Sequence, residues 1–329
     1  MDRIELSPRA RLNIALTLIC LIIVGSFSVI FYGVYQVYYA PASLFSRDFN
    51  GPGTAEEFFE QRVINVAVLG LHNREEDNTY GDIYYVDTIL VASINFDLDT
   101  LTLLAVPRDS YVEIAHSGVQ DRIRQSYSYG YKESSNDRHE DGLRFAVDTV
   151  SLLLDGIELH YYIAMDIQGL KQLIDSLGGV FYTVEKPMIG YTPQESLDAG
   201  PQLLDGQGYL SYLTYREPDA RDDLNRIKRQ KALLLATFDY FKKMGLFSYV
   251  IPSYVAYREN VYTDLNFNQV AALTIFAGER LETDAIGDYS LQGEYFTLDE
   301  GETYYLLIDE NKKEEILKSM SGVSGGRGY

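Results

Sequence analysis

The first clear feature of the hydrophobic pattern is an uncharged run of about 24 residues from Leu12 to Tyr35. At a rise of about 1.5 Å per residue, a helix of this length crosses a hydrocarbon core of roughly 30 Å. The first eleven residues contain three arginines, and basic residues favour the cytoplasmic side of a membrane. We therefore expect a single-pass protein of the cell membrane, with a cytoplasmic tail (1–11), a transmembrane anchor (12–37) and the remainder outside the cytoplasm.

Two other interpretations of this run fit less well. A cleaved signal peptide would have a shorter apolar core and a cleavage site of small residues, which Ala40-Pro41-Ala42 imitates poorly. A lipoprotein signal would place a small residue before its cysteine, whereas Ile19 precedes Cys20. A retained anchor is the interpretation that the pattern favours.

After a linker of turn-forming residues (38–60), apolar runs of strand length alternate with segments that carry apolar residues at helical spacing. The expected strands are Val63–Gly70, Val86–Phe96, Thr100–Val106, Tyr161–Ala164 and Val180–Val184. The expected helices are Gly142–Leu154, Ile167–Leu177, Leu204–Tyr215, Leu224–Lys243, Phe267–Phe276 and Glu314–Met320. The segments near 107–141 and 185–203 are expected to be loops. The alternation predicts an α/β fold, in which a mixed central sheet has helices on both faces. It would form one domain (61–320), followed by a flexible tail (321–329).

Composition narrows the class of function. A formal net charge of −20 argues against nucleic acid as a partner, because a polyphosphate rod requires a positive surface. With a single cysteine, the chain can form no intrachain disulfide. The sequence contains no Gly-rich phosphate loop and no G-x-S-x-G motif, and its four histidines lack metal-ligand spacing.

The remaining candidates for chemistry are charged residues at the ends of the expected strands. Val106-Pro107-Arg108-Asp109 closes one strand, and in open α/β sheets ligands bind beyond the carboxyl ends of the strands. Taken alone, Arg108 and Asp109 would be interpreted as a surface ion pair. Asp87 lies where another strand begins, and its ordinary role would be to cap that strand end.

A second candidate is a basic segment in this acidic chain. Arg216, Arg221, Arg226, Lys228 and Arg229 fall within fourteen residues. On a helix, residue 230 would share a face with residue 226, four positions earlier. A solvated basic face is the ordinary interpretation, but arginine also suits phosphate, to which its planar fork donates two parallel hydrogen bonds.

Taken together and in this order, these elements resemble the LytR-CpsA-Psr family. The matching segments are VAVLGLHNRE, VDTILVASIN, LLAVPRDSYVEI, DRIRQSYSYG, DIQGLKQLIDSLGGV, LDGQGYLSYLTYR and LNRIKRQ. The resemblance implies a membrane-anchored phosphotransferase of bacterial, mainly Gram-positive, envelopes. Such an enzyme transfers a glycopolymer, such as teichoic acid or capsule, from a polyprenyl-pyrophosphate carrier to peptidoglycan, with the lipid tail in an apolar tunnel and Mg²⁺ at the pyrophosphate.

The resemblance also implies roles for individual residues. Asp87 would lie beside the metal and the pyrophosphate, and the catalytic set would be Asp87, Arg108 and Arg216. The residues that would bind the pyrophosphate are Arg74, Arg108, Arg122, Arg216, Arg226 and Gln230. Asp109 would be a structural partner of its neighbours in the P-R-D motif.

Four positions depart from the family pattern. Tyr85 and Thr214 stand where arginines are usual, and His72 stands where an acidic residue is usual. Arg124 replaces an asparagine and, with Glu75, would compensate only if the backbone places it suitably. Two functions therefore stay open, an enzyme with an altered pyrophosphate clamp and a degenerate relative that binds polyprenyl phosphates or regulates envelope assembly without turnover. An unrelated extracytoplasmic domain would lack the tunnel, and a transcriptional role is disfavoured because a tail of about eleven residues cannot read DNA.

Overall fold

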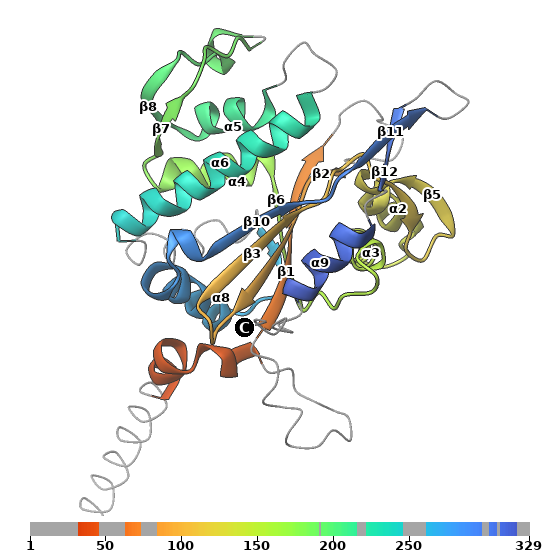
Figure 1. Cartoon of the computed structure of the whole chain (residues 1–329), viewed down its shortest axis with the longest axis horizontal. Coiled ribbons are helices and arrows are strands. Elements are labelled where there is room, and N and C mark those ends of the chain that lie inside the picture. The colour runs from red at the N-terminus through yellow and green to blue at the C-terminus, as the bar shows by residue number, and fades with distance from the viewer. Residues whose placement is uncertain are drawn as a thin grey trace, which may run out of the picture.

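The structure is a computed structural model that describes residues 32–45, 63–73, 84–190, 192–215, 222–245, 261–297, 303–307 and 310–320. A six-stranded sheet forms the centre of this part of the chain, in the order β10-β3-β2-β1-β6-β9 (Figure 1). Its strands are β1 (Val63–Asn73), β2 (Tyr84–Asn95), β3 (Thr100–Ala105), β6 (Tyr161–Asp166), β9 (Val261–Thr263) and β10 (Ile286–Ser290). Strands β1, β3, β6 and β10 run in one direction, while β2 and β9 run in the other. The mixed sheet of an α/β fold is therefore confirmed.

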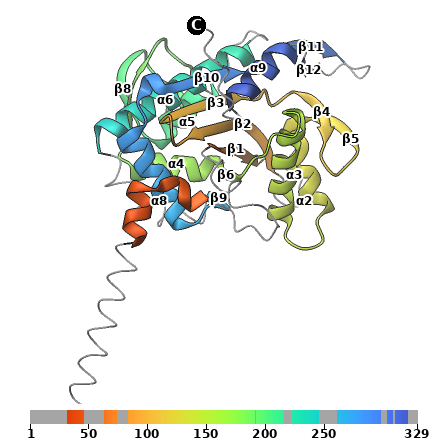
Figure 2. The same ribbon diagram turned by 60° about the horizontal axis from the view of Figure 1, so that its bottom comes forward.

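Helices cover both faces of this sheet, as Figure 2 shows. One face carries α2 (Ser126–Glu133), α3 (Arg138–Leu153) and α9 (Glu310–Met320). The other face carries α4 (Ile167–Ser176), α5 (Gly206–Thr214), α6 (Asp222–Lys243) and α8 (Phe267–Ile275). Because β1 is covered on both sides, its sequence is a nearly continuous apolar run rather than an alternating one.

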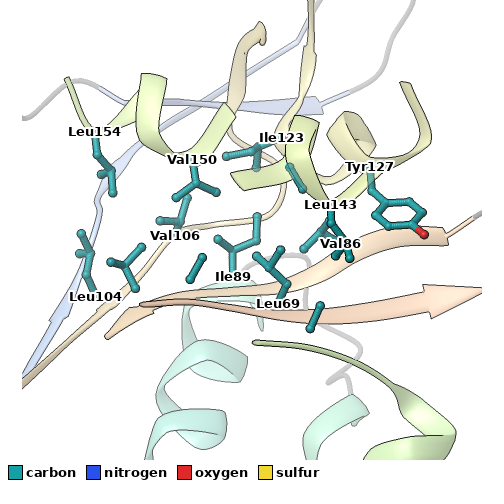
Figure 3. Packing of buried hydrophobic residues seen from close by; sticks show 14 of the residues in the cluster. Leu69, Val86, Ile89, Leu104, Val106, Ile123, Tyr127, Leu143, Val150 and Leu154 are labelled. Atoms are coloured by element: carbon teal, nitrogen blue, oxygen red, sulfur yellow. The ribbon is translucent and has the colours of Figure 1, made fainter. Parts of the chain in front are cut away.

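The larger buried cluster lies between the sheet and α2 and α3 (Figure 3). Leu69 and Ile89 project from the sheet toward Leu143 and Val150 of α3, and all four side chains are almost fully buried. Helix α3 begins earlier than expected because Asp137 caps it, accepting hydrogen bonds from the amides of His139 and Glu140 at 3.0 Å.

The opposite face is closed partly by a segment close to the expected anchor. Residues 32–39 are helical, and η1 (Pro41–Phe45) follows. Phe45 packs against Phe96 and Tyr161, with ring centroids 5.2 and 5.7 Å away. Among the residues that the structure describes, no helix is both long and apolar enough to cross a membrane. Most of the expected anchor (12–37) lies outside those residues, so the anchor stays a prediction.

The structure corrects the expectation of loops near 107–141 and 185–203. The first segment contains the hairpin β4 (Tyr111–Ile114) and β5 (Val119–Arg122), then η3 (Ile123–Gln125) and α2. The second contains η4 (Pro193–Glu195) and β8 (Gly200–Leu204), and β8 pairs with β7 (Val180–Val184) outside the central sheet. These strands have four or five residues each, too few to establish an alternating pattern.

Several other short elements were also missed. They include β9 and β10 of the central sheet, together with η6 (Phe276–Arg280), η7 (Thr283–Ala285), β11 (Gly293–Thr297) and β12 (Thr303–Leu307). The remaining expected elements are confirmed, with their ends shifted by a few residues.

Candidate active site

Asp87 reaches the carboxyl edge of the parallel strands through a β-bulge in β2. The pairing of β1 with β2 passes from Gly70↔Thr88 to Leu71↔Val86 and skips Asp87. As a result Asp87 and Thr88, although consecutive, both line the same cavity. A side chain at position 70 would not fit here, since its Cβ would lie 2.9 Å from the Cβ of Thr88.

Arg108 enters the same edge from a tight turn that ends β3. The amide of Ser110 donates to the carbonyl of Pro107 at 3.1 Å, and the Ser110 hydroxyl donates to the same oxygen at 2.7 Å. This turn directs the Arg108 side chain toward β2, where only 6% of it remains exposed. The predicted position of Arg108 beyond the carboxyl end of a strand is confirmed.

Arg124 joins these residues from η3, which lies far along the chain from β2. The amide of Arg124 donates to the carbonyl of Arg108 at 3.1 Å, and the amide of Ile123 donates to the carbonyl of Ser110 at 2.8 Å. These two backbone hydrogen bonds fix η3 beside the turn that carries Arg108. The backbone therefore places Arg124 at the site, which the sequence had left open.

Two aspartates and two arginines form one charged cluster. Asp87 lies 3.2 Å from Arg108 (Oδ2 to Nη1) and 3.2 Å from Arg124 (Oδ1 to Nη2). Asp109 lies 3.5 Å from Arg108 (Oδ2 to Nε) and 3.8 Å from Arg124 (Oδ1 to Nη1). Each carboxylate thus contacts both guanidinium groups, and the formal charges of the four side chains balance.

The cluster is not saturated with hydrogen bonds. Asp87 Oδ1, Asp109 Oδ1 and Arg108 Nε are buried, and none of them has a hydrogen bond of good geometry within the described structure. Buried polar atoms in native structures are usually bonded to protein, water or an ion. This arrangement suits a ligand that brings both negative oxygens and a cation.

An apolar cavity of about 220 Å³ leads away from the cluster, between the sheet and helices α4, α5 and α6. Asp87 and Arg108 lie at its polar end. The apolar walls come from strands and helices alike and include Val68, Leu90, Ala105, Val106, Ile163, Leu170, Leu213 and Leu234. A ligand with an anionic head and a hydrocarbon tail matches this arrangement.

A second, more polar cavity of about 210 Å³ shares Asp87, Arg108 and Gln230 with the first. It also reaches His72 and Thr214, two of the positions that depart from the expected pattern. The Thr214 hydroxyl donates to the carbonyl of Leu210 at 2.8 Å, so its proton is already used within α5.

Residues 47–322 match the sequence model of the LytR_cpsA_psr family. The chain belongs to this family. The polyisoprenyl-teichoic acid–peptidoglycan teichoic acid transferase TagU of Oceanobacillus iheyensis is 30% identical to it, over 94% of this chain and 91% of the relative.

Solved structures show the same fold. Bacillus subtilis TagV has a TM-score of 0.64 at 21% identity, covering 78% of this chain and 95% of that one. TagT bound to LIIa-WTA has a TM-score of 0.57 at 22% identity, covering 79% and 91%.

The structure places some of the residues that the LytR_cpsA_psr pattern implies, but not all of them. Gln230 lines both cavities, and its amide nitrogen donates to the carbonyl of Leu213 at 3.0 Å. Arg122 ends β5, opposite Tyr111, and is half-buried. Arg74 and Arg216 lie outside the described residues. Residue 226 belongs to α6, and the structure describes its backbone but not its side chain.

Two residues that line the cavity, Lys231 and Tyr209, were not among the site residues predicted from the sequence. Lys231 is 8% exposed, and its ammonium donates to the Asp288 carboxylate and, at 3.1 Å, to the carbonyl of Tyr289. The Tyr209 hydroxyl contacts Thr237 Oγ1 at 3.0 Å, and burial raises the pKa of Tyr209 to about 12. Tyr209 therefore forms a neutral part of the cavity wall.

The described residues include no group of three His, Cys, Asp or Glu side chains that could hold a metal ion by themselves. Mg²⁺ does not require such a group, because it commonly binds one or two carboxylates together with substrate phosphates. Asp87 and Asp109 supply two carboxylates, each with a buried oxygen that makes an ion pair but no hydrogen bond of good geometry. These donors fit a hard cation that is completed by a phosphate ligand.

Proposed function

We propose that this chain is a membrane-anchored phosphotransferase that transfers a glycopolymer from a polyprenyl-pyrophosphate carrier to peptidoglycan. The observation that carries the proposal is the apolar cavity that ends at the Asp87–Arg108 pair. Its walls suit an isoprenoid, and its polar end suits a pyrophosphate. The related TagU protein is a teichoic acid transferase, and this supports the same class of reaction.

The proposed reaction exchanges one phosphorus–oxygen bond for another. A hydroxyl oxygen of the acceptor bonds to the phosphorus that carries the glycopolymer, and the bond from that phosphorus to the bridging oxygen breaks. Polyprenyl phosphate leaves with the bridging oxygen, and the hydroxyl proton is released to a base. Because no covalent enzyme intermediate is needed, the protein contributes alignment and charge neutralisation.

The residues divide these tasks. Arg108 faces the cavity and would neutralise oxygens of the pyrophosphate, while Gln230 would orient it. Arg74, Arg216 and Arg226 are proposed as further phosphate ligands because of the family pattern alone. Asp87, supported by Asp109, would hold Mg²⁺, which supplies charge stabilisation to the phosphoryl group when bound.

The test uses the full chain in detergent, with a short-chain polyprenyl-pyrophosphate glycan, a peptidoglycan acceptor and Mg²⁺. Release of polyprenyl phosphate is measured. We expect Asp87→Asn and Arg108→Ala to lower the rate by about 10²–10³, since each removes a charged group at the developing charge. EDTA should abolish release.

Asp148→Asn is the matched control, because it removes a carboxylate that pairs with His116 at 2.6 Å outside the site. Its rate should equal that of the wild-type chain. Unchanged turnover in both Asp87→Asn and Arg108→Ala would contradict the catalytic roles proposed for these two residues.

A binder without turnover is the second candidate. It is favoured by Thr214, whose hydroxyl is already used within α5 where the family pattern expects a cation. Lipid-phosphate binding with no product, even with metal and acceptor present, would select this function.

A further inference from the structure

Arg124 is a buried cation that the roles described above do not use. Its side chain is 8% exposed, and it contacts Asp87 at 3.2 Å and Asp109 at 3.8 Å. A charge removed from water must be paired, because an isolated buried ion is strongly disfavoured. The position of Arg124 is therefore set by the two aspartates of the candidate active site.

A third contact places this guanidinium over an aromatic ring. Its central carbon lies 5.4 Å from the ring centroid of Tyr85, within the range of a cation–π interaction. Tyr85 lies two positions before Asp87 on β2. One guanidinium thus contacts two neighbouring side chains of this strand, the aromatic ring of Tyr85 and the carboxylate of Asp87.

The contact has an electrostatic consequence for an anionic ligand. Without Arg124, Arg108 alone would face the carboxylates of Asp87 and Asp109, and the cluster would carry a net negative charge. Until a cation binds to the two carboxylates, such a site would repel a pyrophosphate at short range, where little solvent screens the interaction. With Arg124 in place, the charges of the cluster balance.

We propose that Arg124, resting on Tyr85, is a positioning residue that holds Asp87 and Asp109 and keeps the pyrophosphate site from becoming net negative. It supplies from position 124 the positive charge that the resemblance places at position 85. The inference deepens the proposed function and rests on it.

The test measures binding of geranylgeranyl pyrophosphate with Mg²⁺, and of geranylgeraniol, to the full chain in detergent. Arg124→Asn should weaken pyrophosphate binding by roughly 10–100-fold, the usual range for residues that orient a metal-site ligand. Binding of the uncharged alcohol should not change. Arg124→Gln, which fills more of the site without restoring the charge, gives the same test if the asparagine variant folds poorly.

The double variant Tyr85→Arg, Arg124→Asn distinguishes a charge role from a packing role. An arginine at position 85 would begin beneath the place where the Arg124 guanidinium now lies. We expect this exchange to recover most of the lost affinity. A structural role for Arg124 would not be rescued in this way.

Arg280→Asn is the matched control. Arg280 also combines a cation–π contact, with Phe276 at 5.7 Å, and an ion pair, with Asp99 at 2.6 Å. Asp99 lies in the turn at the opposite end of β2, so this variant should bind both probes like the wild-type chain.

The outcomes separate the two proposals. If the wild-type chain prefers the pyrophosphate and Arg124→Asn behaves like Arg280→Asn, the inference fails and the proposed function stands. Weakened binding that the exchange does not recover also overturns the inference. A wild-type chain that binds the pyrophosphate no better than the alcohol overturns both.

Discussion

At the scale of residues, the site depends on how buried charges share their partners. Asp87 and Asp109 each contact both arginines, at distances from 3.2 to 3.8 Å. A phosphate oxygen can therefore replace a carboxylate at an arginine while the other pairs persist.

Tyr209 gives the cavity wall a dependence on pH. Burial raises its pKa to about 12, whereas a tyrosine in the unfolded chain has a pKa of about 10. The folded chain therefore binds this proton more tightly, and the stabilisation is complete below pH 10 and lost as pH rises from about 10 to 12. The loss amounts to about 2–3 kcal/mol.

We expect the melting temperature of the wild-type chain, followed by circular dichroism, to fall over this pH range. The fall should be smaller in Tyr209→Phe. Tyr295→Phe removes an exposed hydroxyl as a control and should follow the wild-type curve. Equal pH dependence in all three chains would contradict this account.

Sequence reasoning found part of this site and missed the rest for a physical reason. Asp87 and Arg108 were candidates because each lies near the end of an expected strand, which can be predicted from local hydrophobicity. Their roles in a phosphate site were implied by the resemblance to the family. The contact of Arg124 with Asp87 depends on two backbone hydrogen bonds between η3 and the turn after β3. No local pattern encodes such a pairing. Lys231 was missed because its partner, Asp288, lies 57 residues away.

At the scale of elements, the bulge in β2 is the feature that builds the site. It sets two consecutive side chains, Asp87 and Thr88, on the cavity side of the sheet. The close approach of Gly70 to Thr88 makes the bulge possible. The shape of β1 and the chemistry of β2 are therefore linked.

Gly70→Ala tests this link. The new Cβ would lie 2.9 Å from the Cβ of Thr88, so one of the two strands must shift. We expect a loss of about 1–3 kcal/mol in stability, as for other overpacked sites, and a clear loss of polyprenyl phosphate release. Gly287→Ala in β10 is the control, because its nearest neighbour is the movable ring of Tyr289 at 3.2 Å. A fully active Gly70→Ala chain would show that the bulge does not need the glycine.

The wall between sheet and helices provides a second test. Ile163 of β6 lines the apolar cavity, so Ile163→Trp should occupy space that the proposed hydrocarbon tail would fill. We expect affinity for a twenty-carbon prenyl pyrophosphate to fall about tenfold or more, since each buried CH₂ contributes about 0.8 kcal/mol. Binding of dimethylallyl pyrophosphate should change little. Phe181→Trp, on an exposed position of β7, is the control. An equal loss of affinity for the long and the short prenyl pyrophosphate would show that the prenyl tail does not bind in this cavity.

The long elements could be predicted from the sequence, and most of the short ones could not, although the five-residue strand β7 was predicted. The apolar run of β1 and the amphipathic pattern of α3 extend over enough residues to be distinctive. Strand β9 is held by pairing with β6, which lies far away in the sequence, so its formation depends on the assembled central sheet. Strand β8 pairs with the preceding strand β7 in a separate two-stranded sheet.

At the scale of the whole molecule, the expected topology is open to a direct test. The chain contains one cysteine, Cys20, inside the expected anchor. In a Cys20→Ser background, a membrane-impermeant maleimide added to intact cells should label Ser43→Cys and should not label Ser7→Cys. Lysis should expose both positions. Labelling of Ser7→Cys in intact cells would reverse the topology.

The position of η1 has a consequence for where the chemistry takes place. Phe45 of η1 packs on Phe96, just beyond one end of β2, while Asp87 lies near the other end of that strand (Figure 1). At about 3.3 Å per residue, these two points are separated by roughly 30 Å. If the proposed anchor holds η1 at the bilayer with β2 along the membrane normal, the candidate site would stand above the lipid surface by about the thickness of a hydrocarbon core. The proposed carrier lipid would then have to leave the membrane to reach the site, and its isoprenoid would exchange one apolar environment for another.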